Sequence, residues 1–150
     1  GGFRIGTAAT PRLLWVLQSE GATVLIDGPG GGGKNNTHGT LTLGAQYYLL
    51  RTLWVHAGLG FATYRIVDTV QETQVVDLER NGFAYASAVG FDLFRSPDLW
   101  SFGFRRQDFA ISFEVRVVGA LYPGDTDAMG EKQKTGGIVQ ITSGFGFQWY

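Results

Sequence analysis

The 150-residue sequence predicts an all-β chain folded as an up-and-down antiparallel β-barrel. Apolar residues alternate with small or polar ones at a period of two, and helical periodicity is nearly absent. Short and long connections also alternate along the chain, as they do when neighbouring strands are joined by hairpins at the two ends of a barrel.

Seven segments carry the strand pattern. In one of them Val55 and Leu59 alternate with His56 and Gly58, and the same pattern recurs in most of the others. The expected strands are Gly2–Thr10, Leu14–Asp27, Thr40–Leu50, Trp54–Tyr64, Gly82–Phe94, Phe109–Tyr122 and Ile138–Tyr150.

The connections between these strands differ in length. We expect short turns at Thr10–Leu13 and Arg51–Leu53, and an intermediate connection at Arg95–Asp108 that opens with the turn residues Ser96-Pro97-Asp98. The long connections, expected at the opposite end, are Asp27–Thr37, Asp68–Asn81 and Pro123–Thr135.

Composition removes several classes of function. Charged residues make up 17% of the chain, against roughly 25% in average soluble proteins. A net charge of −1 provides no basic surface for nucleic acid. The absence of cysteine excludes disulfides, cysteine-bound metal clusters and thiol catalysis. We therefore expect one domain over residues 1–150, with no cofactor and no nucleic-acid partner.

One face of the expected strands is apolar, and the other is rich in glycine, alanine and polar residues. Small residues suit a crowded barrel interior, and on a water-facing sheet they would weaken the strands. The three lysines, Lys34, Lys132 and Lys134, all fall in long connections, although a water-facing sheet normally carries lysine along its strands. These features place the apolar face in lipid, against the alternative of a soluble ligand-binding barrel, and predict a transmembrane barrel.

The four tryptophans lie at one end of the expected barrel. Trp15, Trp54 and Trp100 each follow a turn by a few residues, and Trp149 is next to the last residue. Indole rings favour the membrane–water interface, so this placement predicts half of an interfacial aromatic girdle. Trp54 and Trp100 have even numbers, so either a bulge re-aims them outward or they point inward.

The strand–short turn–strand–long loop plan and the amphipathic last strand, Ser143–Tyr150, resemble the small outer-membrane β-barrels of Gram-negative bacteria. The resemblance implies insertion by the barrel-assembly machinery, which recognises a last strand that ends in an aromatic residue. This chain ends in Tyr150, but its apolar alternation falls on Phe145, Phe147 and Trp149, one residue out of step.

The expected strand count is odd, whereas bacterial single-chain barrels have even numbers from eight upward. We therefore expect an eighth strand before Gly1. The alternative is that Leu99–Arg105 forms a separate short strand, with Arg106–Asp108 as its turn.

Charged residues of both signs share the inward face of the strands. Buried charges persist when they are paired and hydrogen-bonded, so this mixed set predicts a polar plug, and a narrow channel for small solutes or ions is the alternative. The expected lumen network consists of Arg4, Glu20, His56, Asp92, Glu114 and Arg116.

Three motifs suggest other chemistry without completing it. Gly28–Asn35 ends in Asn where a phosphate-binding loop has Ser or Thr, and no helix pattern follows it. Asp125 and Asp127 are weak calcium candidates, because the segment lacks the remaining ligands of an EF-hand. His56 suggests a lipid A-modifying enzyme as an alternative, but no serine or acid completes a catalytic set beside it. The second histidine, His38, is expected at a loop end.

From these observations we expect a monomeric, non-enzymatic protein of the bacterial outer membrane. Its partners are the lipid bilayer and lipopolysaccharide, and its long loops serve a structural or surface-interaction role. A porin-like channel is the main alternative, followed by the lipid-modifying enzyme and the soluble barrel.

Overall fold

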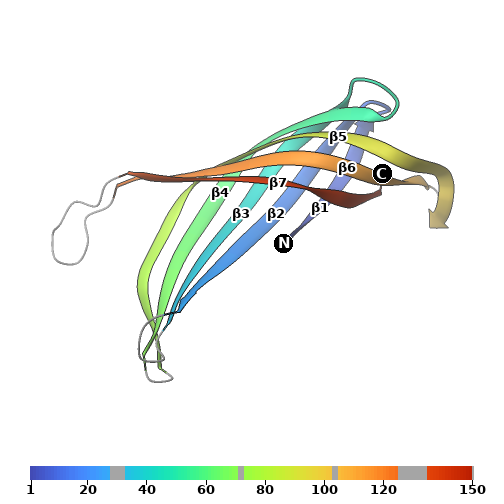
Figure 1. Ribbon diagram of the computed structural model, residues 1–150. Helices are drawn as coiled ribbons and strands as arrows, with labels where there is room; N and C mark the ends of the chain where they lie inside the picture. The colour runs from blue at the N-terminus through green and yellow to red at the C-terminus, as the bar shows by residue number, and fades with distance from the viewer. Residues whose placement is uncertain (28–32, 71–72, 103–104, 125–134, 150) are drawn as a thin grey trace.

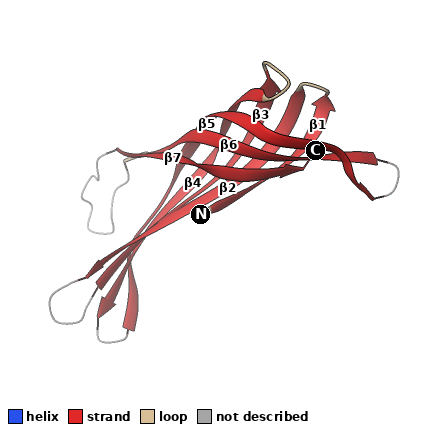
Figure 2. Cartoon of the chain, turned by 45° about the vertical axis from the view of Figure 1, so that its right-hand side comes forward, coloured by secondary structure: helices blue, strands red, loops and turns tan. Residues whose placement is uncertain are grey.

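The computed structural model is one seven-stranded antiparallel sheet in the order β1-β2-β3-β4-β5-β6-β7 (Figures 1 and 2). It describes residues 1–27, 33–70, 73–102, 105–124 and 135–149. The strands are β1 Gly2–Thr10, β2 Leu13–Asp27, β3 Gly33–Tyr48, β4 Leu53–Val70, β5 Thr73–Phe102, β6 Arg105–Tyr122 and β7 Gly136–Trp149. The up-and-down all-β fold predicted from periodicity is confirmed, although the sheet is not closed.

Several strands are longer than the sequence pattern indicates. β2 and β3 stay paired up to Asp27↔Gly33, and β4 and β5 stay paired up to Val70↔Thr73. The predicted long connections Asp27–Thr37 and Asp68–Asn81 are therefore wrong in extent, because cross-strand hydrogen bonding continues through polar residues that show no apolar alternation. The connection Pro123–Thr135 does fall between two strands.

The predicted turn at Arg95–Asp108 is also largely strand. β5 continues to Phe102, and its pairing with β6 shifts in register between Ser96 and Trp100. The alternative of a separate strand at Leu99–Arg105 is wrong, because residues 99–102 belong to β5 and Arg105 begins β6. A register shift accommodates the Ser-Pro-Asp sequence without ending the strand.

The short turns between β1 and β2 and between β3 and β4 lie at the same end of the sheet (Figure 1). Thr10 Oγ1 accepts a hydrogen bond from the backbone N–H of Leu13 at 3.0 Å and so fixes the first turn. The backbone N–H of Tyr48 donates to the Arg12 carbonyl at 2.8 Å, which ties the first turn to the start of the second.

Burial separates the two faces as the alternation predicts. Even-numbered side chains such as Val16, Trp54 and Val118 are buried on the inner face, whereas odd-numbered Leu43, Phe61 and Ile141 are exposed on the outer face. Among the described residues there is no helix with the length and hydropathy needed to cross a membrane.

Candidate functional site: a polar network across the interior

Four charged side chains meet on the inner face at the open side of the sheet. Arg4 of β1 donates from Nη2 to Glu114 Oε2 of β6 at 2.7 Å. Arg116, two residues along β6, forms ion pairs with Glu114 and with Glu20 of β2. Because β6 is far from β1 and β2 in sheet order, these contacts show that the sheet curls until its two sides meet across the interior.

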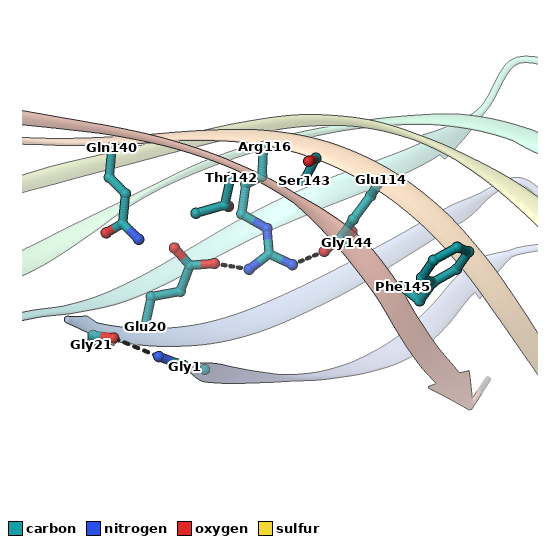
Figure 3. Close-up of a pocket in the computed structure, with 11 residues that line it drawn as sticks. Gly1, Glu20, Gly21, Glu114, Arg116, Gln140, Thr142, Ser143, Gly144 and Phe145 are labelled. Carbon is teal, nitrogen blue, oxygen red and sulfur yellow. Dashed lines mark hydrogen bonds and ion pairs between the residues drawn. The ribbon is translucent and has the colours of Figure 1, made fainter.

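The four charges balance, with two arginines and two glutamates. Their side chains are only 9–16% exposed, so each charge is largely removed from water and depends on its partner. Figure 3 shows Arg116 lying between the two carboxylates. The cluster therefore contains charges of both signs in contact with one another and is not a ring of one sign.

A second cluster surrounds the buried carboxylate of Asp92 near the short-turn end. Trp54 Nε1 and Ser112 Oγ lie 3.0 and 2.8 Å from Asp92 Oδ1, and Tyr48 Oη lies 3.1 Å from Oδ2. All three groups donate hydrogen bonds to the carboxylate of Asp92, and the whole residue is only 2% exposed. The Asp92 backbone N–H donates to the Thr52 carbonyl at 2.7 Å, which holds the residue beside the turn.

Arg4 joins the two clusters. Its guanidinium carbon lies 4.8 Å from the centroid of the Trp54 ring, within the range of a cation–π contact. A continuous path of contacts therefore runs from Glu20 through Arg116, Glu114, Arg4 and Trp54 to Asp92, and five of the seven strands contribute to it.

His56 is brought to the interior but does not join this network. It is 3% exposed, and both of its ring nitrogens lack a hydrogen-bond partner among the described residues. Its ring lies against Gly44 and Gly58, where a Cβ on either glycine would press on the imidazole. No serine–histidine–acid arrangement forms here within the described part of the chain.

Of the predicted aromatic girdle, Trp15 is 51% exposed on the outer face, as expected. The structure corrects the assignment of Trp54 to the girdle, because its side chain is fully buried and donates a hydrogen bond to Asp92 on the inner face. Its even number already indicates that side, and no bulge re-aims it because its pairing with Tyr48 and Gly90 is regular. The side chains of Trp100 and Trp149 lie outside the described part of the structure.

An aromatic group fills the interior toward the opposite end. His38, predicted at a loop end, lies instead within β3 and is 7% exposed. Its ring meets that of Tyr122 edge-on at 6.2 Å, and Tyr122 also packs against Tyr64 at 5.9 Å. These rings form a third cluster of buried side chains on the inner face, besides the four paired charges and the Asp92 cluster.

The remaining predicted sites are the calcium candidates and the glycine-rich segment. Asp125, Asp127 and most of the glycine-rich segment 28–35 lie outside the described residues. Within the described residues no group of three or more histidines, cysteines or acids is placed to hold a metal ion. Periodicity alone did not single out Tyr48, Trp54 and Ser112 as partners of Asp92, although their shared even numbering was the available signal.

No protein-family model, curated protein or solved structure matches the chain.

Proposed function

We propose that the chain is an integral β-barrel protein of a bacterial outer membrane, with a polar plug in its interior and a structural or surface-interaction role. It is not an enzyme in this proposal, and its partners are the bilayer, lipopolysaccharide and the barrel-assembly machinery. The segments opposite the short turns face the outside and carry any contact with other molecules.

One observation supports the membrane location above all others. Large apolar side chains on the outer face of all seven strands are 37–77% exposed, as at Val55, Leu59 and Phe61. Some pack on one another along this face, as Phe113 and Phe145 do with ring centroids 5.5 Å apart. Soluble monomers rarely expose apolar patches above a few hundred Å², so a band of this extent favours contact with lipid.

The interior supports a plug over a channel. An interior of about eight strands is just wide enough for side chains to fill, and here Trp54, Tyr122 and the paired arginines all point inward. A conducting pore would need to displace one of these groups. We therefore expect the protein to be silent in a planar bilayer.

Purification tests the location directly. The protein should remain monodisperse only in detergent or lipid, and it should migrate differently on a gel before and after boiling, as folded membrane barrels do. Monodisperse protein in plain buffer would contradict the membrane proposal.

The same proposal can be tested by the change in folding free energy when either of two outward-facing leucines is replaced by arginine. Leu59→Arg places a charge in the middle of the apolar band and should cost about 2–4 kcal/mol of folding free energy in vesicles. Leu25→Arg, near the far end of β2, should cost about 0–1 kcal/mol, as at a membrane interface. Equal costs at the two leucines would contradict burial of the band in lipid.

A further inference from the structure

A cavity lies beside the four paired charges on the inner face of the sheet (Figure 3). Its volume is about 240 Å³, the space that about eight water molecules take up at ~30 Å³ each. Glu20 and Arg116 of the charged network line it together with Gln140 and Thr142 of β7. The cavity is therefore large enough for a small molecule and is bordered by charged, amide and hydroxyl groups.

Glu20 presents an unused hydrogen-bond acceptor at this cavity. Its side chain is only 9% exposed, and its Oε1 is paired with Arg116, but Oε2 is buried with no hydrogen-bond partner in the described part of the chain. In Figure 3 the Glu20 carboxylate has Arg116 on one side and the Gln140 amide on the other. A buried carboxylate oxygen without a donor is unfavourable, so this atom calls for a donor from a bound molecule.

A donor is also unused at the same cavity. Nε of Arg116 is buried and has no acceptor within the described residues, although both terminal nitrogens of this guanidinium are ion-paired. A molecule that satisfies Glu20 and Arg116 together must both donate and accept hydrogen bonds.

The side of the cavity formed by β7 is open. A Cβ added at Gly144, which lines the cavity, would meet no atom within 4 Å. Elsewhere on the inner face the glycines are covered, since a Cβ at Gly60 would clash with the Leu41 backbone and one at Gly90 would clash with the Trp54 ring. A small molecule can therefore lie against Gly144 without displacing a side chain.

The charges around the cavity select against a charged ligand. Two arginines and two glutamates already pair with one another, so an ion would add a buried charge with no partner. A hydroxyl group is uncharged and both donates and accepts through one oxygen, which matches the carboxylate, guanidinium, amide and hydroxyl groups of the lining.

We propose that this cavity is a binding site for a small uncharged molecule with several hydroxyl groups. One hydroxyl donates to Glu20 Oε2, and the others form hydrogen bonds with Gln140 and Thr142. A few convergent polar groups in a concave site are typical of small-molecule recognition. The site depends on the inner face alone, so it depends neither on the membrane location nor on conduction through the interior.

Saturation-transfer NMR tests the site with the whole chain refolded in deuterated detergent. The probes are glycerol and xylitol, and 3-amino-1,2-propanediol is a positively charged analogue of glycerol. Gly144→Leu fills the open side of the cavity. Gly146→Leu is the matched control, because Gly146 is on the same strand and face and equally uncovered but does not line the cavity.

Two further variants test the polar contacts without filling the cavity. Gln140→Leu and Thr142→Val each remove hydrogen-bonding groups from the lining and leave the four ion-paired residues unchanged. Loss of one hydrogen bond should weaken polyol binding by about 2- to 10-fold. These variants also keep the proposal testable if Gly144→Leu fails to fold.

We expect a saturable signal from glycerol or xylitol that Gly146→Leu retains and Gly144→Leu reduces at least tenfold. The charged analogue should bind more weakly than glycerol. The absence of a saturable signal from both polyols would overturn the proposal and leave water as the only occupant. Equal signals in the two glycine variants, or tighter binding of the charged analogue, would also overturn it.

Discussion

Removing the Asp92 carboxylate should destabilise the fold more than any other loss of a single charge on β5. Trp54, Tyr48 and Ser112 come from three other strands and all donate to this one buried group, at 2.8–3.1 Å. The Asp92→Ala variant removes the acceptor that these three buried donors share.

The magnitude follows from these contacts. A hydrogen bond to a charged group contributes about 1.5–3 kcal/mol, so three contribute about 4.5–9 kcal/mol before any offset. Burying the carboxylate costs several kcal/mol, which reduces the net effect to about 3–5 kcal/mol, the range found when one partner of a buried charged pair is removed. Asp92→Asn keeps one acceptor oxygen for Trp54 and Ser112, so it should cost less than Asp92→Ala.

Urea unfolding of the protein refolded into lipid vesicles, followed by tryptophan emission, measures these differences. Glu79→Ala is the matched control, because Glu79 is an exposed acid on the same strand. We expect the order Asp92→Ala, then Asp92→Asn, then Glu79→Ala, from most to least destabilised. A change at Asp92→Ala of less than about 0.5 kcal/mol, typical of surface substitutions, would refute the role assigned to the cluster.

Three further predictions concern the interior. Glu114→Gln should cost about 3 kcal/mol in the same unfolding assay, because Arg4 and Arg116 each lose a buried partner; a cost equal to that of Glu79→Gln would contradict this. Gly60→Ala should cost about 1–3 kcal/mol by overpacking against the neighbouring backbone, whereas Gly144→Ala should be neutral, and the reverse order would be inconsistent with the packing. The unmodified protein should show no conductance steps in a planar bilayer, and steps that respond to Arg116→Ala would instead support the channel.

Period-two alternation was sufficient to predict which side chains face inward. The even numbers of Glu20, Glu114 and Arg116 place them on one face before any pairing is known, and in the structure Arg116 forms ion pairs with both glutamates. Alternation is informative here because one face is uniformly apolar, so a shift of one residue would expose the charged set to the wrong surroundings.

Contacts between strands could not be predicted in the same way. Arg4 reaches Glu114 across 110 residues of sequence, and only the curl of the sheet decides that these two side chains meet. The preference of tryptophan for interfaces predicts a girdle position for Trp54, but the buried Asp92 offers its N–H a stronger partner. Periodicity does not predict the first residues of β3 or the last residues of β4, because polar strand residues such as Asn36 show no alternation of apolar and polar side chains.

The most direct test of the outward apolar face compares Trp15 with Trp54 in bilayers. Two variants each keep one of these tryptophans and replace the other three with phenylalanine, and brominated lipids then quench emission from indoles that touch acyl chains. We predict strong quenching of Trp15, which is 51% exposed on the outer face, and little quenching of the buried Trp54. Trp15 emission that responds to aqueous iodide but not to brominated lipid would contradict a lipid-facing outer surface.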